Sequence, residues 1–226
     1  MFLRELFEKE CKKSKTIEAS VFSTLRKAIY IGYLYPGEKL VENELARKIG
    51  VSRTPIRAAI LRLERGNLLV NTPQKGARVA KLSPAEVEEG YAVMGVLQGF
   101  AAYLAIPNLD DGMICEMEDL QSQLKSKKLL EEYNLWLQVN NKFHNVFINA
   151  SNNPHLVHII KENLGRLTRY WYLACSFGFL KKSIYYHDQI FECIKMKDKN
   201  NVRKTVEEHF FETGKDIRNH LEKIMI

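Results

Sequence analysis

The chain has 226 residues, 46% of them hydrophobic, which is enough for two domains with separate cores. Its net charge of +7 is uneven: residues 1–80 hold 16 Lys and Arg against 8 Asp and Glu, whereas residues 81–226 hold 18 against 19. Four scattered cysteines without CxxC spacing exclude a disulfide framework or zinc knuckle and fit a reducing cytoplasm. No apolar run approaches the ~20 residues of a membrane span, so we expect no membrane association.

Residues 37–63 have the pattern of two short helices joined by a tight turn at Gly50 and Val51. Another helix is expected before residue 37, and residues 1–13 suggest a short amphipathic extension of this first helix. In the second helix we expect Ser52 to be the N-cap, its hydroxyl accepting a backbone N–H. Pro55 falls in the first turn, where its missing N–H costs nothing. The apolar positions recur at helical spacing and are expected to be buried: Leu40, Leu45, Ile49, Ile56, Ala59, Ile60 and Leu63.

Arg53 and Arg57 are four residues apart and should project from one face of the second helix. Such a pair suits the DNA major groove, where arginine hydrogen-bonds guanine edges through two N–H groups. The alternative is an ordinary pair of surface arginines. The context favours DNA, because residues 67–81 give a hairpin signal around 73–76 and the positive charge lies on this part of the chain. Helix, helix, turn, helix and hairpin make a winged helix-turn-helix.

Residues 18–83 resemble the N-terminal domain of the GntR family of bacterial transcription regulators. The resemblance is carried by the PGEKL turn, the GVSRTPIR core and a basic wing that contains glycine. In that family the second motif helix enters the major groove and the wing tip reaches the minor groove. The resemblance therefore implies that Arg53, Thr54 and Arg57 contact the groove and phosphates, and that Lys75 and Gly76 form the wing tip.

The domain boundary is expected near Leu82, which gives a DNA-binding domain at residues 1–82 and a second domain at residues 83–226. Ser83, Pro84 and Glu86 predict a capping box at the start of the second domain, with Glu86 reaching back to the N-cap. Six helices and no strand are expected to follow. Apolar residues within 87–104 and 113–124 line the first two helices. The other four helices are expected at about 129–150, 155–177, 182–196 and 200–224. The predicted fold class is therefore mainly α, a winged helix followed by an all-α six-helix bundle.

Three of the six histidines, His144, His187 and His209, fall on otherwise apolar stripes of three different helices, and Asn140 lies one turn before His144. A single inward histidine is most often a core residue with a hydrogen-bond partner. Three are harder to satisfy separately, because each buried polar group needs a partner. One shared cation would satisfy all of them, and imidazole suits zinc, nickel, copper or iron.

Residues 83–224 resemble the FCD effector domain of the FadR-type branch of the same family. Many members of that branch bind a divalent metal through an aspartate, a histidine four residues later and two histidines from the last two helices. The resemblance places Asn140, His144, His187 and His209 at these positions. Asn140 departs from the family pattern, and its uncharged amide oxygen binds transition metals more weakly than a carboxylate.

A second departure concerns the effector. Family members often carry an arginine and a glutamate four residues apart in the first helix of this domain, and the arginine often helps to hold a carboxylate ligand. Here these positions are Met94 and Gln98, so the pair is lost together and no unpaired charge is buried. Arg166 and Arg169 are candidate replacements for binding an organic-acid effector, although either fits equally well as a surface residue.

The sequence thus predicts a cytoplasmic, ligand-responsive transcription regulator that binds double-stranded operator DNA as a homodimer. A small-molecule effector, assisted by a divalent transition metal such as zinc or nickel, would bind in the helical domain. One alternative is a helical metal-dependent enzyme with a DNA-binding appendage, but no acid or base residue has a telling spacing from the histidines. Another is a non-specific, architectural DNA binder, against which stands the nearly uncharged helical half.

Overall fold

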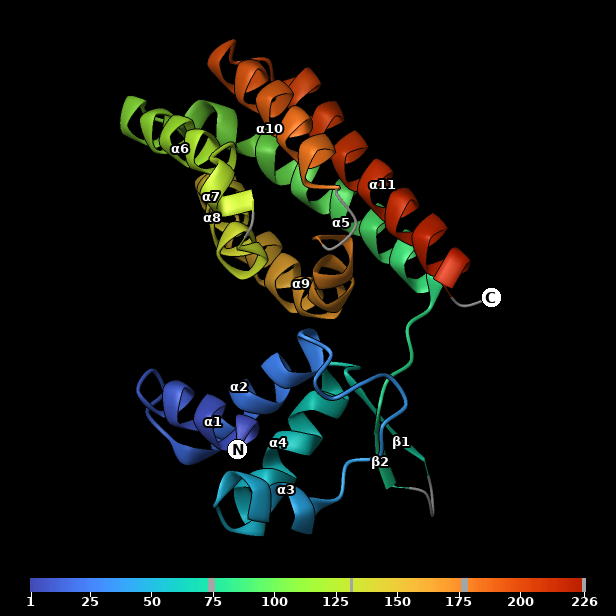
Figure 1. The fold of residues 1–226 in the computed structure, drawn as a ribbon. Coiled ribbons are helices and arrows are strands. Elements are labelled where there is room, and N and C mark those ends of the chain that lie inside the picture. Colours follow the sequence, from blue (N-terminus) through green and yellow to red (C-terminus); the bar gives the residue numbers. More distant parts are fainter. Residues whose placement is uncertain (73–75, 131, 176–178, 225–226) are drawn as a thin grey trace. The chain divides into compact units, whose positions relative to one another are not determined.

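The computed structural model describes residues 1–72, 76–130, 132–175 and 179–224, without some side chains inside these ranges (Figure 1). The chain divides into two compact units, Met1–Leu82 and Ser83–Ile226. The first unit is a winged helix and the second is entirely helical in its described part. The predicted fold class, mainly α with an N-terminal winged helix-turn-helix, is confirmed.

The first unit consists of four helices followed by a two-stranded antiparallel hairpin (Figure 1). In this hairpin Leu69 is opposite Val79 and Asn71 is opposite Ala77. Lys39 also forms a bridge with Arg78, so the segment before α3 lies along the free side of β2. The elements are α1 (Phe2–Cys11), α2 (Ile17–Tyr30), α3 (Glu42–Ile49), α4 (Arg53–Arg65), β1 (Leu69–Thr72) and β2 (Gly76–Val79).

All seven apolar residues predicted to face inward from residues 37–63 are buried. Gly50 ends α3 in the left-handed conformation, with φ +87°, which a glycine adopts without steric cost. Ser52 is the N-cap residue of α4, but its hydroxyl makes no capping hydrogen bond, so that part of the prediction is wrong. Residues 1–13 are also not an extension of α2: α1 is a separate helix, because Thr16 caps a new helix by accepting the Ala19 N–H.

The second unit is a helical bundle. The predicted third helix is instead divided into a single-turn helix and a long one, and a short 3-10 turn follows the first helix. The elements are α5 (Pro84–Ala105), η1 (Ile106–Asn108), α6 (Asp111–Leu124), α7 (Lys127–Leu130), α8 (Tyr133–Ala150), α9 (Pro154–Cys175), α10 (Leu180–Lys195) and α11 (Lys199–Ile224).

The helices α5 and α11 lie side by side along their length (Figure 1). Glycines allow this close approach: a Cβ atom at Gly99 would lie 2.9 Å from the Arg203 carbonyl oxygen, and one at Gly214 would lie 2.6 Å from the Tyr91 Cβ. The pair forms one wall of the bundle: α8 and α9 pack on α5, α10 packs on α11, and α6 packs on α8 and α10.

The start of α5 differs from the predicted capping box. Ser83 does cap the helix, its hydroxyl accepting the Glu86 N–H at 3.3 Å. The Glu86 carboxylate, however, accepts a hydrogen bond from the Tyr170 hydroxyl at 2.8 Å, and the same hydroxyl accepts the Ser83 N–H at 3.2 Å. Tyr170 of α9 therefore stands between the two residues that were expected to meet directly.

The segment Pro84–Asn108, which contains α5, is long and apolar enough to cross a membrane by length and composition alone. This corrects the expectation that no apolar run reaches that length. Half of its apolar window is buried inside the protein, and residues such as Val87, Tyr91 and Met94 are within the core. The core helix of a water-soluble domain meets the same criterion, so α5 carries no membrane assignment.

Candidate functional site

The N-terminal turns of α4 carry the two arginines that the sequence selected for DNA contact. Their side chains are 65% exposed at Arg53 and 73% at Arg57, while the apolar stripe of α4 is buried. Both guanidinium groups lie near one carboxylate: Arg53 Nη2 is 3.2 Å and Arg57 Nε 3.9 Å from the Glu42 oxygens. Thr54 is exposed beside them. Glu42, which the sequence analysis did not select, thus holds the arginine pair to the start of α3.

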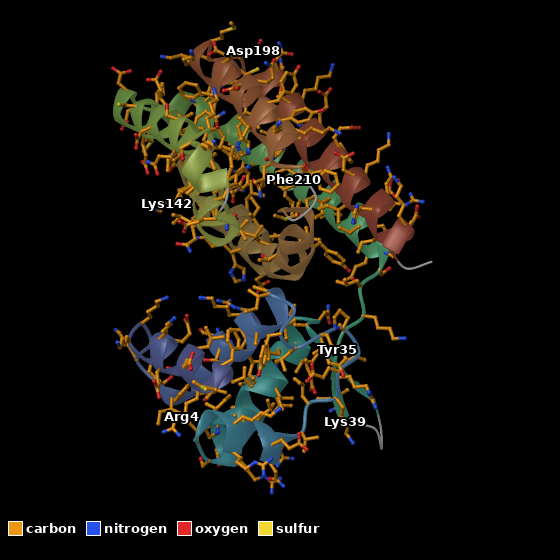
Figure 2. The ribbon with its side chains drawn as sticks, in the orientation of Figure 1. Arg4, Tyr35, Lys39, Lys142, Asp198 and Phe210 are labelled. Carbon is orange, nitrogen blue, oxygen red and sulfur yellow. The ribbon has the colours of Figure 1, made fainter. Side chains whose placement is uncertain are left out.

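A groove runs from these arginines to the hairpin and is lined by Lys39, Glu42, Arg53, Arg57, Asn71 and Gly76, among others. Lys39 (Figure 2) is exposed, and its Cε lies 3.7 Å from where a Gly76 Cβ would be. Gly76 begins β2 with φ +76°, a conformation that favours glycine. Lys75 lies outside the described residues. Sequence reasoning missed Lys39, because its bridge with Arg78 joins positions 39 residues apart.

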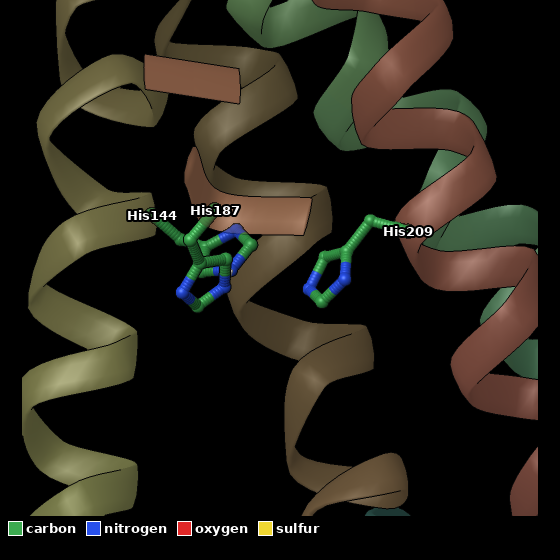
Figure 3. A group of neighbouring side chains, drawn as sticks. All are labelled: His144, His187 and His209. Carbon is green, nitrogen blue, oxygen red and sulfur yellow. The ribbon is translucent and has the colours of Figure 1, made fainter. Parts of the chain in front are cut away.

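In the helical unit, His144 from α8, His187 from α10 and His209 from α11 converge to form what we call the histidine cluster (Figure 3). One candidate ligand atom from each lies within 4.8 Å of the others. The ring centroids are 5.0 Å apart for His144–His187 and for His187–His209, and 5.5 Å apart for His144–His209. The structure therefore brings together three side chains that are separated by up to 65 positions in the sequence.

All three imidazoles of the histidine cluster are buried, which favours the neutral ring. Burial lowers the pKa of His144 to about 3. Burial also lowers the pKa of His187, followed in importance by the charges of His209 and His144, and it lowers the pKa of His209, followed by the charge of His144. Neutral imidazole is the form that binds metal ions, so the cluster needs no deprotonation to act as a ligand set.

The hydrogen bonds of His144 indicate its tautomer. Its Nδ1 is 2.9 Å from the Gln98 side-chain oxygen, which can only accept, so we place the proton on Nδ1. The Nε2 then carries a lone pair and lies 3.1 Å from the His187 Nε2. Two nitrogens bound to one metal at about 2.1 Å are about 2.9–3.4 Å apart. Gln98, considered in the sequence only as part of a lost ion pair, thus orients a candidate ligand.

A small cavity of about 30 Å³ opens beside the histidine cluster. Its lining includes Gln98, Asn140, His144, His209 and Thr213. Among the described residues, three buried polar atoms of the site have no hydrogen-bond partner: Asn140 Oδ1, His187 Nδ1 and His209 Nδ1. Such atoms are costly to bury unsatisfied, so the site fits a polar occupant, and its donors, imidazole nitrogens and an amide oxygen, fit a borderline transition metal.

The side chains of Arg166 and Arg169 lie outside the described residues, although Leu164, Leu167 and Thr168 of the same helix line the cavity. The histidines not selected for the site lie elsewhere: His155 and His158 are exposed, and His158 Nε2 is 3.4 Å from Glu162.

Comparisons with known proteins agree with both halves of this description. Residues 17–79 match the bacterial regulatory protein family gntR, and residues 89–212 match the FCD domain. The chain is 29% identical over 208 residues to YdhC of Bacillus subtilis, described as an uncharacterized HTH-type transcriptional regulator, covering 89% of this chain and 91% of the relative. It is 27% identical over 199 residues to the HTH-type transcriptional regulator McbR of Escherichia coli, covering 87% and 90%.

Solved structures share the fold. The structure of E. coli McbR/YncC matches with a TM-score of 0.74 at 24% identity, covering 92% of this chain and 100% of the other. A GntR regulator from Rhodococcus matches with a TM-score of 0.69 at 16% identity, covering 88% and 96%. The families and relatives are transcription regulators, which excludes the enzyme considered as an alternative. The chain belongs to the GntR family of bacterial regulatory proteins and, with its FCD domain, is a DNA-binding transcription regulator.

Proposed function

We propose that the protein is a cytoplasmic homodimer that binds operator DNA through residues 1–82 and senses a small molecule, with a bound transition metal, through residues 83–226. The observation that carries the sensing half is the histidine cluster: three buried, neutral imidazoles from three helices beside a polar cavity. The cost of burying these groups is offset if they share one occupant. A purely structural core at this place would be stabilised by apolar side chains.

His144, His187 and His209, together with the Asn140 oxygen, would hold the metal. Bound there, the metal would supply positive charge and a free coordination position for an oxygen of the effector. Gln98 fixes the His144 ring through its Nδ1, the role that an outer hydrogen-bond partner has in metal sites. Because Asn140 brings no negative charge, an acidic effector, an organic acid above all, would itself supply the charge that the family's aspartate normally provides.

The size of the cavity indicates how sensing operates. About 30 Å³ accommodates an ion or one to two water molecules but no organic acid. Effector binding therefore has to displace side chains or helices that line the cavity, among them residues of α5, α8 and α11. A ligand that binds the opened arrangement better shifts the population toward it and so changes the affinity for DNA.

In the DNA-binding half, Arg53 and Arg57 would contact base edges and phosphates, with Thr54 beside them and Lys39, Lys75 and Gly76 serving the wing. Glu42 supports this role in a specific way. Its carboxylate holds both guanidinium groups at the start of α4 and so reduces the side-chain entropy that binding would otherwise cost.

The test is binding to the protein's own upstream DNA, measured by fluorescence anisotropy at fixed salt against a random duplex. We expect Arg53→Ala to weaken specific binding by about 1–3 kcal/mol, or roughly 5- to 150-fold, if Arg53 contacts a base edge. Arg65→Ala is the matched control, because Arg65 is an exposed arginine in the last turn of the same helix, outside the lining of the groove. Equal losses of affinity in the two variants would mean that Arg53 contributes only its general positive charge. Equal affinity of the wild type for the upstream and the random duplex would favour an architectural DNA binder.

A further inference from the structure

Three buried polar atoms on α10 and on α6, which packs against it, have no hydrogen-bond partner among the described residues. They are His187 Nδ1, Ser183 Oγ and Gln121 Oε1, on side chains of residues that are 0%, 4% and 4% exposed. A buried polar group that lacks a partner costs free energy. Three of them in two contacting helices therefore point to an arrangement that satisfies them together.

The Nδ1 of His187 needs a partner that can both donate and accept. In the metal-free protein His144 Nδ1 donates to Gln98, so the His144 Nε2 is an acceptor. The His187 Nε2, 3.1 Å away, then carries the proton of this hydrogen bond, and the His187 Nδ1 is an acceptor. When the His187 Nε2 binds a metal instead, the proton of the neutral ring lies on Nδ1, which becomes a donor. A hydroxyl group can serve both forms.

Ser183 offers such a hydroxyl one turn before His187, on the same buried stripe of α10. Side chains in a helix lean toward its N-terminus, so the His187 ring lies over the turn that contains Ser183. The Ser183 hydroxyl is also uncommitted. The hydroxyls of Thr168, Thr205 and Thr213 each donate to the carbonyl four residues earlier in their helices, whereas the Ser183 hydroxyl does not.

Gln121 of α6 is held in a fixed orientation against α10. Its Nε2 donates to the Ile184 carbonyl oxygen at 3.2 Å and to Asp188 Oδ1 at 2.9 Å. The carbonyl can only accept, which identifies the nitrogen of the amide and leaves Oε1 as the atom without a partner. Asp188 Oδ1 is also 2.6 Å from Lys125 Nζ, so the amide is anchored to an ion pair near the surface.

We propose that Ser183 is the positioning residue of His187 and that its hydroxyl follows the tautomer of the ring. In the metal-free protein the hydroxyl donates to Nδ1. With Nε2 bound to a metal, the hydroxyl accepts the Nδ1–H and donates its own proton to Gln121 Oε1, which satisfies all three atoms. A change of the Ser183 rotamer or one bridging water closes the chain. The proposal rests on the proposed function, because the Nε2 lone pair is held for the metal.

The outer partners of the two rings are then alike in being uncharged. Gln98 of α5 serves His144, and Ser183 with Gln121 serves His187. Many ligating histidines donate to a carboxylate, which raises their basicity and adds negative charge near the ion. With neutral partners, the charge of the ion is left for a bound anion to balance. This deepens the role proposed for an acidic effector.

Zinc affinity, measured by calorimetry on the chelator-treated full chain, tests the positioning role. Ser183→Ala should raise the dissociation constant about 10- to 100-fold, because the N–H of a metal-bound imidazole forms the stronger hydrogen bond and loses its acceptor. Ser183→Thr keeps the hydroxyl and should restore affinity to within about threefold. Ser151→Ala is the matched control: Ser151 is 5% exposed in the same unit, and its hydroxyl donates to the Ile148 carbonyl oxygen. Its affinity should equal that of wild type.

A double-mutant cycle tests the chain to Gln121. Gln121→Leu should weaken zinc binding about 3- to 10-fold, because the Ser183 hydroxyl loses the acceptor that it uses in the metal-bound form. Combined with Ser183→Ala it should cost no more than Ser183→Ala alone, since the two residues act in one chain. Fully additive losses would separate Gln121 from Ser183. Circular dichroism checks that each variant is folded.

Nitrogen NMR of the imidazoles gives a readout that a merely structural serine would not change. The His187 signals, assigned by their absence in His187→Phe, should show the proton on Nε2 without zinc and on Nδ1 with zinc. In Ser183→Ala the Nδ1 signal should shift in both forms, because each loses its hydrogen bond to the hydroxyl. In Ser151→Ala neither signal should shift.

Unchanged Nδ1 signals and wild-type zinc affinity in Ser183→Ala would overturn the proposal and make the backbone carbonyl of residue 183 the partner. The metal-free spectrum keeps this failure distinct from that of the proposed function. If wild type binds no zinc but Ser183→Ala still shifts the metal-free Nδ1 signal, Ser183 does position His187 and the metal is wrong. If zinc binds through the histidine cluster but is indifferent to Ser183, only the positioning role fails.

Discussion

We expect Asn140 to limit how strongly the histidine cluster can hold a cation. Its oxygen is buried and has no hydrogen-bond partner among the described residues, but it carries no charge. We expect Asn140→Asp to raise the affinity for zinc or nickel at least about tenfold, worth about 1.4 kcal/mol, because the carboxylate adds a negative charge beside the ion. Isothermal titration calorimetry on chelator-treated protein measures this.

The matched control for that change is Asn149→Asp, which adds the same charge at an exposed position of the same helix. Its metal affinity should equal that of wild type, and His187→Ala should reduce binding below detection. An equal gain from both aspartates would mean that long-range charge, and not ligation at position 140, sets the affinity.

We also expect the histidine cluster to lower the stability of the metal-free protein in acid. Its pKa values lie well below the ~6.5 of an exposed histidine, so between about pH 6.5 and pH 3 the unfolded chain binds more protons than the folded one. Stability must therefore fall as the pH decreases through this range. Urea unfolding should give a lower free energy of unfolding at pH 5.5 than at pH 7.5, by about 1 kcal/mol or more for each buried imidazole.

The corresponding control is His187→Phe. Phenylalanine cannot be protonated, and the ring can keep the stacking on Phe143, whose centroid is 4.7 Å from that of His187. This variant should lose less stability between the two pH values than wild type. An identical loss would assign the acid sensitivity to groups other than the cluster.

At the scale of elements, the contact between α5 and α11 depends on glycine. A Cβ at Gly99 would lie 2.8 Å from the Glu207 Cγ and 2.9 Å from the Arg203 carbonyl oxygen, and backbone cannot move aside as a side chain can. Gly99→Ala should therefore destabilise the protein by about 1–3 kcal/mol, despite the ~1 kcal/mol that alanine gains in helix propensity. Thermal unfolding measures the change.

Gly112→Ala in the exposed first turn of α6 tests whether this loss comes from packing. A Cβ there meets only the Asp110 side-chain oxygen at 3.3 Å, so the variant should be as stable as wild type or slightly more stable. If Gly99→Ala is stabilised to the same degree, the two helices have room to separate and the close approach is not needed.

Sequence alone predicts the elements whose causes are local. The stripe of α4, the left-handed turn at Gly50 and the Ser83 cap all follow from residues within one or two turns of each other. The bond between Gln98 and His144 joins positions 46 residues apart, and Tyr170 enters the Ser83 cap from 87 residues away. No periodicity encodes such contacts, because they depend on how helices pack after they form.

At the scale of the whole molecule, α5 is the element that connects the parts. It begins at the boundary between the two units, and its inner face carries Gln98 against the histidine cluster. A change at the cluster that shifts α5 would therefore reach the segment of chain that leads to the winged helix. This is a physical basis for coupling an effector to DNA affinity without a separate relay of side chains.

That arrangement also predicts the spacing of the operator. In the proposed homodimer, two winged helices related by two-fold symmetry suit half-sites one helical turn apart, so a pair centred about 10–11 base pairs apart should bind tightly. Inserting five base pairs turns the second half-site to the opposite face of the duplex and should cost at least about tenfold in affinity. Anisotropy titrations on duplexes built from the footprinted half-site measure this. A wild type that binds both spacings alike would show that the winged helices are not held at a fixed separation.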